Sequence, residues 1–175
     1  MDIVAHGLWA GLGIAWAGKY HRINTKTKMA TIGLAVAPDL IHLLPLMIAA
    51  PFAANGLEIF TAYVNASPGF EPPLSPNLNQ LTHHLHCVMH SALVAGAITA
   101  AVWLWLGRLW VPLLGWWSHI LIDVFTHSAE FYPSPVLYPL TYWGFDGIAW
   151  NAPWFMSINY AVMTIVAYII FLRRN

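Results

Sequence analysis

The chain has 175 residues, of which 59% are hydrophobic and only 8% are charged. Soluble domains carry about 25% charged residues, so this composition argues against a water-soluble fold. Seven Lys and Arg residues balance seven Asp and Glu residues, which leaves no net charge to attract nucleic acid. The single cysteine, Cys87, forms no internal disulfide and offers no thiolate zinc site, so metal chemistry must come from His, Asp and Glu.

Polar and proline-rich breaks divide the chain into five apolar segments. A helix needs about 20 mostly apolar residues to cross a bilayer. We therefore predict an all-α integral membrane bundle of about five transmembrane helices in one domain, residues 1–175. The predicted spans cover about residues 3–18, 29–54, 81–106, 109–131 and 152–172. Residues 55–80 are rich in proline and predict a loop, with a short interfacial helix near residues 57–64.

The basic residues predict the orientation of the bundle. If the N-terminus lies outside, all seven Lys and Arg residues fall in cytoplasmic parts, at residues 19–28, at Arg108 and at residues 173–174. The C-terminus is then cytoplasmic. The first residues, Met1-Asp2-Ile3, lack the positive charge of a signal peptide, so we expect the first apolar segment to remain in the protein.

Two carboxylates, Asp39 and Asp123, fall well inside the predicted spans, where an ionised acid costs about 2.5 kcal/mol or more. These spans offer no Lys or Arg as a partner, which leaves histidines and a bound metal. His119, Asp123, His127 and Glu130 follow one another at spacings of four, four and three, so they share one helix face. This spacing favours a metal site.

Further candidate ligands lie on the other spans. His86 and His90 have the i, i+4 spacing of a chelating pair, and the same span carries His83 and His84 near its outer end. The predicted metal ligands are His6, Asp39, His42, His86, His90, His119 and Asp123.

The helical rise predicts how these ligands group. At about 1.5 Å per residue, Asp39, His90 and His119 lie near ~15 Å below the outer surface, and the other candidates lie nearer to it. We expect one metal at Asp39, His90 and His119. We expect a second at His6 and Asp123, completed by His42 or His86, with a bridging carboxylate between the two.

The ligand types predict the metal and its chemistry. Carboxylates with imidazoles suit Zn²⁺ best, with Mn²⁺ or Fe²⁺ as alternatives. Two such ions activate a water and hold the oxygens of a phosphoester during hydrolysis. Asp123 or His127 would then protonate the leaving oxygen. The roles of His83, His84 and Glu130 near the outer surface remain open, since solvated side chains cost little there.

Several short runs carry a family resemblance: His6, the run PDLIH at 38–42, HCVMHS at 86–91 and GWWSHILID at 115–123. In these, the chain resembles the bacterial inner-membrane metal-dependent hydrolases of the YdjM-like family, which are similar to zinc-dependent phospholipase C and the P1-type nucleases. The resemblance extends from His6 to about residue 140. It differs at Ile41, where the family usually has a second aspartate. It implies a metal-dependent hydrolase of phosphoesters in the bacterial inner membrane. The depth of the predicted site favours a lipid or lipid-linked substrate that is reached from the outer leaflet or the periplasm.

Two other classes of protein fit part of the pattern. Metal transporters and metal-sensing membrane proteins also place His and Asp on facing helices near the middle of the bilayer. A b-type haem protein would use paired histidines such as His90 and His119 as axial ligands. The oligomeric state is not predicted.

Overall fold

The computed structural model describes residues 1–66, 70–130 and 133–172. In these parts the chain is helical and contains no strand, as predicted. Seven α-helices and one short 3₁₀ helix follow one another as α1 Ile3–Ala17, α2 Thr25–Ala49, η1 Ala50–Phe52, α3 Gly56–Asn65, α4 Pro76–Met89, α5 Ala92–Leu106, α6 Leu113–Thr126 and α7 Pro153–Phe171.

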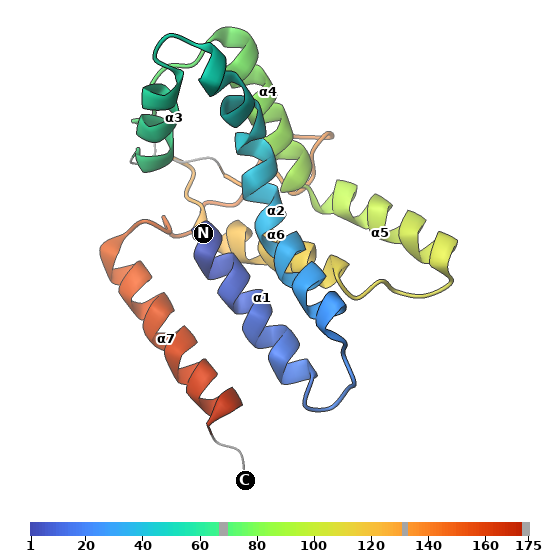
Figure 1. The fold of residues 1–175 in the computed structure, drawn as a ribbon. Helices are drawn as coiled ribbons and strands as arrows, with labels where there is room; N and C mark the ends of the chain where they lie inside the picture. The colour runs from blue at the N-terminus through green and yellow to red at the C-terminus, as the bar shows by residue number, and fades with distance from the viewer. Residues whose placement is uncertain (67–69, 131–132, 173–175) are drawn as a thin grey trace.

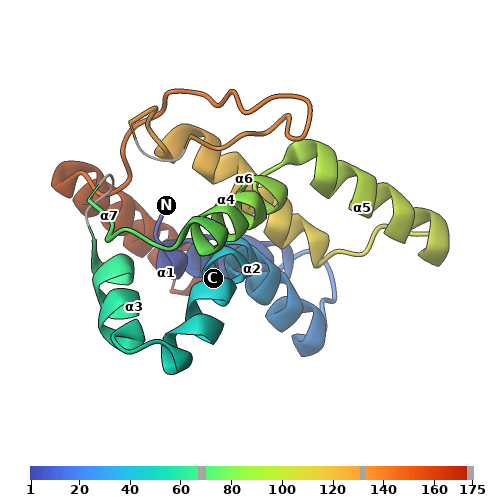
Figure 2. The same ribbon diagram turned by 90° about the horizontal axis from the view of Figure 1, so that it is seen from above.

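Helix α2 is the centre of the arrangement, with its main contacts to α1, α4 and α6 (Figures 1 and 2). Helix α7 packs beside α1, while α5 extends away from the other helices and, among the described helices, contacts α4 and α6 (Figure 1). Helix α3 follows the end of α2 and packs against η1. The short helix expected near residues 57–64 is present as α3. The N-terminus lies among the helices, near the middle of the molecule.

Helix lengths bear on the membrane prediction. In the described residues, α2 with η1 (Thr25–Phe52) and α7 are long and apolar enough to cross a bilayer. Helices α4 and α5 form a third candidate span, broken and bent by 59°. Helices α1 and α6 are apolar but have only 15 and 14 residues. Two or three spans are thus supported; five spans and the orientation stay predictions, and the predicted C-terminal charges, Arg173 and Arg174, lie outside the described residues.

Polar groups lie between α1 and α7, and apolar side chains face outward. The indole Nε1 of Trp9 donates to Asn159 Oδ1 at 3.0 Å, and the Tyr160 hydroxyl donates to Asp2 Oδ1 at 2.9 Å. Asp2 also accepts the backbone N–H of Ala5 and so caps α1. Large apolar side chains on the outer face of α7 remain exposed, among them Trp154, Ile158, Ile165 and Ile169. This distribution is typical of helices that pack in lipid.

Two predicted spans differ from the observed helices. Residues 81–106 are not one helix, because α4 ends at Met89 and α5 begins at Ala92. The predicted span 109–131 is shortened to α6, which begins at Leu113 and ends at Thr126. The break near His90 and the early end of α6 both change where the candidate ligands point.

Candidate metal centre

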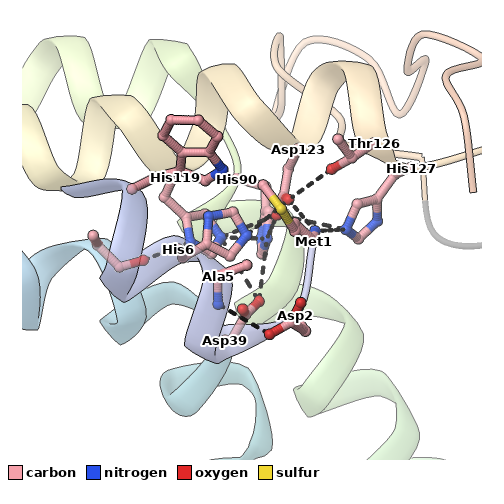
Figure 3. A network of polar contacts seen from close by, with 12 residues as sticks. Met1, Asp2, Ala5, His6, Asp39, His90, His119, Asp123, Thr126 and His127 are labelled. Atoms are coloured by element: carbon pink, nitrogen blue, oxygen red, sulfur yellow. Dashed lines mark hydrogen bonds and ion pairs between the residues drawn. The ribbon is translucent and has the colours of Figure 1, made fainter. Parts of the chain in front are cut away.

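Four buried side chains from three parts of the chain converge on one point (Figure 3). Asp39 comes from α2, His90 from the end of α4, and His119 and Asp123 from successive turns of α6. Each offers one nitrogen or oxygen atom, and these four atoms lie within 4.8 Å of one another. The group unites ligands that the sequence distributed over two metals, since Asp123 joins Asp39, His90 and His119.

Backbone carbonyls orient both imidazoles of this group. His90 Nδ1 lies 2.9 Å from the carbonyl oxygen of His86, and His119 Nδ1 lies 2.7 Å from that of Ala35. A carbonyl only accepts, so each Nδ1 carries the hydrogen and each Nε2 presents a lone pair. Metal-binding histidines are held in this way by a partner on the other ring nitrogen.

The two lone pairs face each other and a carboxylate. His90 Nε2 and His119 Nε2 are 3.0 Å apart, and each lies 3.1 Å from Asp123 Oδ2. Asp39 Oδ1 lies 3.7 Å from both nitrogens. A proton on one of the two Nε2 atoms would form a hydrogen bond with only one of these acceptors. A cation at the centre would bind all of them.

The spacing fits a small divalent ion. Tetrahedral zinc with bonds of about 2.0–2.1 Å separates its ligand atoms by about 3.4 Å. The contacts of 3.0 to 3.7 Å lie on either side of this value. The second oxygen of Asp39, Oδ2, is buried and has no hydrogen-bond partner among the described residues. Two imidazoles and two carboxylates therefore form a donor set that could hold Zn²⁺, Mn²⁺ or Fe²⁺.

The other oxygen of Asp123 faces a different set of groups. His6 Nε2 lies 2.9 Å from Asp123 Oδ1, and the amino group of Met1 contacts the same oxygen. The Met1 amine is also 3.2 Å from His127 Nε2. The His6 ring stacks on His119 with its centroid 3.8 Å away. Asp123 thus has one oxygen on each of two neighbouring clusters, which is the arrangement of a bridging carboxylate.

The remaining predicted ligands line the edge of this group. The His86 ring stacks on His90 at 4.0 Å and meets His42 edge to face at 5.6 Å. His127 lies just after α6 and reaches Asp123 Oδ2 at 3.5 Å. These three histidines do not join the four-atom group but lie beside it, and His86 also supplies the carbonyl that orients His90.

His83, His84 and Glu130, which the sequence predicted near the outer surface, stay outside the centre. The Nδ1 atom of His84 lies 2.8 Å from the Tyr138 hydroxyl, and His83 stacks against Tyr142. Glu130 is exposed and follows the end of α6, so it does not share the helix face of His119 and Asp123. The sequence spacing predicted Glu130 on that face because it assumed a helix that continues to residue 130, whereas α6 ends at Thr126.

A glycine brings α6 against α2. A Cβ atom on Gly115 would lie 2.0 Å from the carbonyl oxygen of Thr31, so only glycine fits here. Gly115 and His119 are one turn apart on α6, as Thr31 and Ala35 are on α2. The close approach of the two helices therefore brings His119 Nδ1 within hydrogen-bonding distance of the Ala35 carbonyl.

The break between α4 and α5 positions His90. Ser91 caps α5 by accepting the N–H of Val94, and its hydroxyl donates to the carbonyl of Tyr138 at 2.6 Å. From α6, the indole of Trp116 donates to the carbonyl of Met89 at 2.6 Å. The backbone groups freed by the break are thus satisfied by neighbouring elements. Neither proline nor glycine stands at 90 or 91, so the sequence carries no ordinary signal for this break.

The loop that follows α6 closes its end. Gly147, Ile148 and Trp150 donate backbone N–H groups to the carbonyls of His127, Phe125 and Thr126. Asp146 accepts the N–H of Ala129 at 2.7 Å and so supports the same loop. These bonds end the helix at Thr126 and hold His127 against Asp123.

Searches against family models, curated proteins and solved structures find no match to this chain. The resemblance to the YdjM-like hydrolases therefore stays a prediction. The geometry itself does not favour the haem alternative. Axial ligands bind on opposite faces of a porphyrin, and the Nε2 atoms of His90 and His119 are only 3.0 Å apart.

Proposed function

We propose that the protein is a membrane-embedded, metal-dependent hydrolase that cleaves a phosphoester in a lipid or lipid-linked molecule. The observation that carries the proposal is the buried group of Asp39, His90, His119 and Asp123. It lies beside a cavity of about 280 Å³ that Asp39 and His127 both line. Ligands for a cation and room for a substrate thus meet at one place, which is what a hydrolytic centre requires.

Two cations are part of the proposal, with zinc as the best fit. The first would be held by the four-residue group. The two-sided contacts of Asp123 support a second beside His6, because Oδ1 faces that ring while Oδ2 faces His90 and His119. His42 and His86, which the sequence offered as ligands of this second ion, line the cavity, and the His86 ring stacks on His90.

Cations bound there would supply a water of lowered pKa and would polarise the phosphoryl oxygens. Asp39, His90, His119 and Asp123 would hold these cations, and the burial of the four side chains keeps bulk water away from the centre. His127 lines the cavity within 3.5 Å of Asp123 Oδ2, so it is placed to give a proton to the leaving oxygen. Asp123, the other candidate for that role, is engaged through both of its oxygens.

The membrane location is part of the same proposal. A multi-pass protein of the bacterial inner membrane, with its site toward the periplasm, agrees with the distribution of basic residues and with the family resemblance. The candidate spans and the outward apolar face of α7 support a membrane location. A substrate held in or on the bilayer would then reach the site without leaving the lipid.

The test joins metal analysis with an activity screen. Purified protein is analysed for bound metals and assayed on phospholipids and lipid phosphates for release of headgroup or phosphate. We expect Asp123→Asn to lose both metal and turnover, and His127→Gln to lose turnover while it keeps its metal. Glu130→Gln, an exposed change outside the centre, should match the wild type. Full turnover in Asp123→Asn would overturn the proposal.

A metal transporter or metal sensor is the second candidate, and the broken helix favours it. Transporters often bind ions where a membrane helix is interrupted, and His90 stands at the break between α4 and α5. Metal flux into proteoliposomes in the absence of any hydrolysis would support this class. Metal binding without flux would exclude transport.

A further inference from the structure

The cavity beside the metal centre has walls of two kinds. One wall is polar and is formed by Asp39, His42, His86 and His127. An apolar wall is formed by Val4 of α1, Leu43 of α2, Val64 of α3 and Trp150. A ligand that satisfies both walls has a polar group at the metal centre and an apolar part on the side of α1 and α3.

The volume of the cavity limits how much of a ligand it encloses. Drug-sized ligands occupy pockets of about 300–1,000 Å³, and this cavity has about 280 Å³. A polar head and the first few carbons of a chain would fill it. The remainder of any long chain must therefore lie outside.

The apolar wall is also the side on which the cavity opens to the outside. Val4 and Val64 line the cavity, and yet 63% and 50% of their surfaces are exposed. Further exposed apolar side chains, Phe52 and Phe70, stand just before and after α3. Exposed apolar side chains thus lie both at the cavity and around α3, where a bilayer would supply acyl chains.

The charge of the cavity makes recognition of an anion depend on the metal. Asp2, Asp39 and Glu71 line it, and no Lys or Arg is among the described residues of its walls. Met1 also lines the cavity, but its amino group is paired with Asp123. A phosphate head would be repelled by these carboxylates unless cations occupied the centre. The head therefore binds at the metal end, which directs the chain toward α3.

We propose that the substrate is a phosphate ester with a long alkyl or acyl chain, and that this chain leaves the cavity between Val4 of α1 and Val64 of α3. The inference rests on the proposed function and adds to it the class of substrate and the path of its chain. Val4 and Val64 then select for chain length, although neither touches the reacting atoms.

The test uses two substrates that differ only in their chains: the p-nitrophenyl phosphodiesters that carry a methyl or a dodecyl group. Both release p-nitrophenolate, so their ratio of kcat/KM isolates recognition of the chain. We expect the wild type to favour the dodecyl ester by about tenfold or more, the effect of burying two or more methylenes. Val64→Trp and Val4→Trp should abolish this preference while bound metal is retained.

Leu57→Trp is the matched control, because Leu57 lies on the same helix, is 73% exposed and does not line this cavity. It should keep the preference for the dodecyl ester. An unchanged preference in Val64→Trp and Val4→Trp would overturn the inference. Hydrolysis of neither ester by the metal-loaded wild type would count against the proposed function instead.

A second measurement tests the path of the chain without turnover. Dodecyl phosphate with a photoreactive diazirine in its chain is crosslinked to the zinc-loaded full-length protein, and the labelled residues are mapped by mass spectrometry. We expect labels at the start of α1, at Leu43 and on α3, and their loss after removal of the metal. Labels confined to the outer faces of α5 and α7, or unaffected by metal removal, would overturn the inference.

Discussion

The Nε2 atoms of His90 and His119 lie 3.0 Å apart, although both rings use Nδ1 to donate to a backbone carbonyl. Two lone pairs therefore point at each other within a buried site, and the Oδ2 atom of Asp123 lies 3.1 Å from both. Such a convergence of acceptors is stabilised by a cation. This relationship is the basis of the proposals made above and of the predictions that follow.

Removal of one imidazole should weaken metal binding strongly. Partners outside the coordination sphere contribute about 10–100-fold to affinity, so we expect His119→Ala to lose more than about 100-fold. Isothermal titration with Zn²⁺ measures the change. His84→Ala is the control, because His84 contacts the Tyr138 hydroxyl away from the centre. Equal affinities in the two variants would show that His119 is not a ligand.

Gly115→Ala should disturb the site from a distance. The added methyl group would meet the Thr31 carbonyl and push α6 away from α2, which lengthens the hydrogen bond from His119 to Ala35. We expect a stability loss of about 1–3 kcal/mol from overpacking, with zinc affinity reduced by about tenfold or more.

Gly33→Ala supplies the matched control for this change, since a Cβ at Gly33 on α2 has no neighbour within 4 Å. Alanine is favoured over glycine in a helix by about 1 kcal/mol, so this variant should be as stable as the wild type or more so. Thermal unfolding in detergent compares the two. If Gly115→Ala behaved like Gly33→Ala, close packing of α2 on α6 would not control the site.

Ser91→Ala should loosen the break that presents His90. The change removes the cap of α5 and the bond to the Tyr138 carbonyl, at a cost of about 1–2 kcal/mol. We also expect zinc affinity to fall by about tenfold, because His90 is the residue before Ser91. Ser118→Ala loses only a bond to a carbonyl of its own helix and should keep full affinity. The same affinity in both variants would contradict this role of Ser91.

Chelation should lower the thermal stability of the wild type. A ligand that binds only the folded state stabilises it by about 2.7 kcal/mol at 100 times its Kd, so Tm should fall after treatment with a chelator and recover with Zn²⁺. The His119→Ala variant should show little response to either addition. A Tm that does not respond to metal in the wild type would argue that the acidic and imidazole groups are held by their hydrogen bonds alone.

The sequence predicted the chemistry of the site better than its geometry. The spacing of four between His119 and Asp123 needs only one continuous helix, and α6 supplies it. Asp39 was predicted as a ligand because an ionised acid is costly in hydrocarbon and the spans offer no basic partner. His90 was predicted because histidines were then the remaining partners. The grouping of the ligands differed from the prediction, because the depth of each residue was derived from straight helices and Asp123 reaches both clusters with its two oxygens.

Long-range contacts decided what no local pattern could show. The break at His90 depends on Trp116 and Tyr138, which are distant from it in sequence and bind the carbonyl of Met89 and the hydroxyl of Ser91. The end of α6 depends on the loop at residues 147–150. Backbone N–H groups of this loop donate to the carbonyls of residues 125–127, so these carbonyls do not continue the helix after Thr126. Periodicity along the sequence contains no information on contacts with other segments. It therefore predicted that the helix face of Asp123 continues to Glu130.

By itself, the sequence determined that the chain is apolar, helical and equipped with more imidazoles and buried acids than a lipid environment tolerates without partners. Those properties arise from composition and from spacing along one helix. Only the tertiary structure decided which of these side chains share a centre, which line the cavity and which face outward. The physical reason is that ligand convergence depends on how closely helices approach and where they break, and both are set by contacts between segments far apart in the chain.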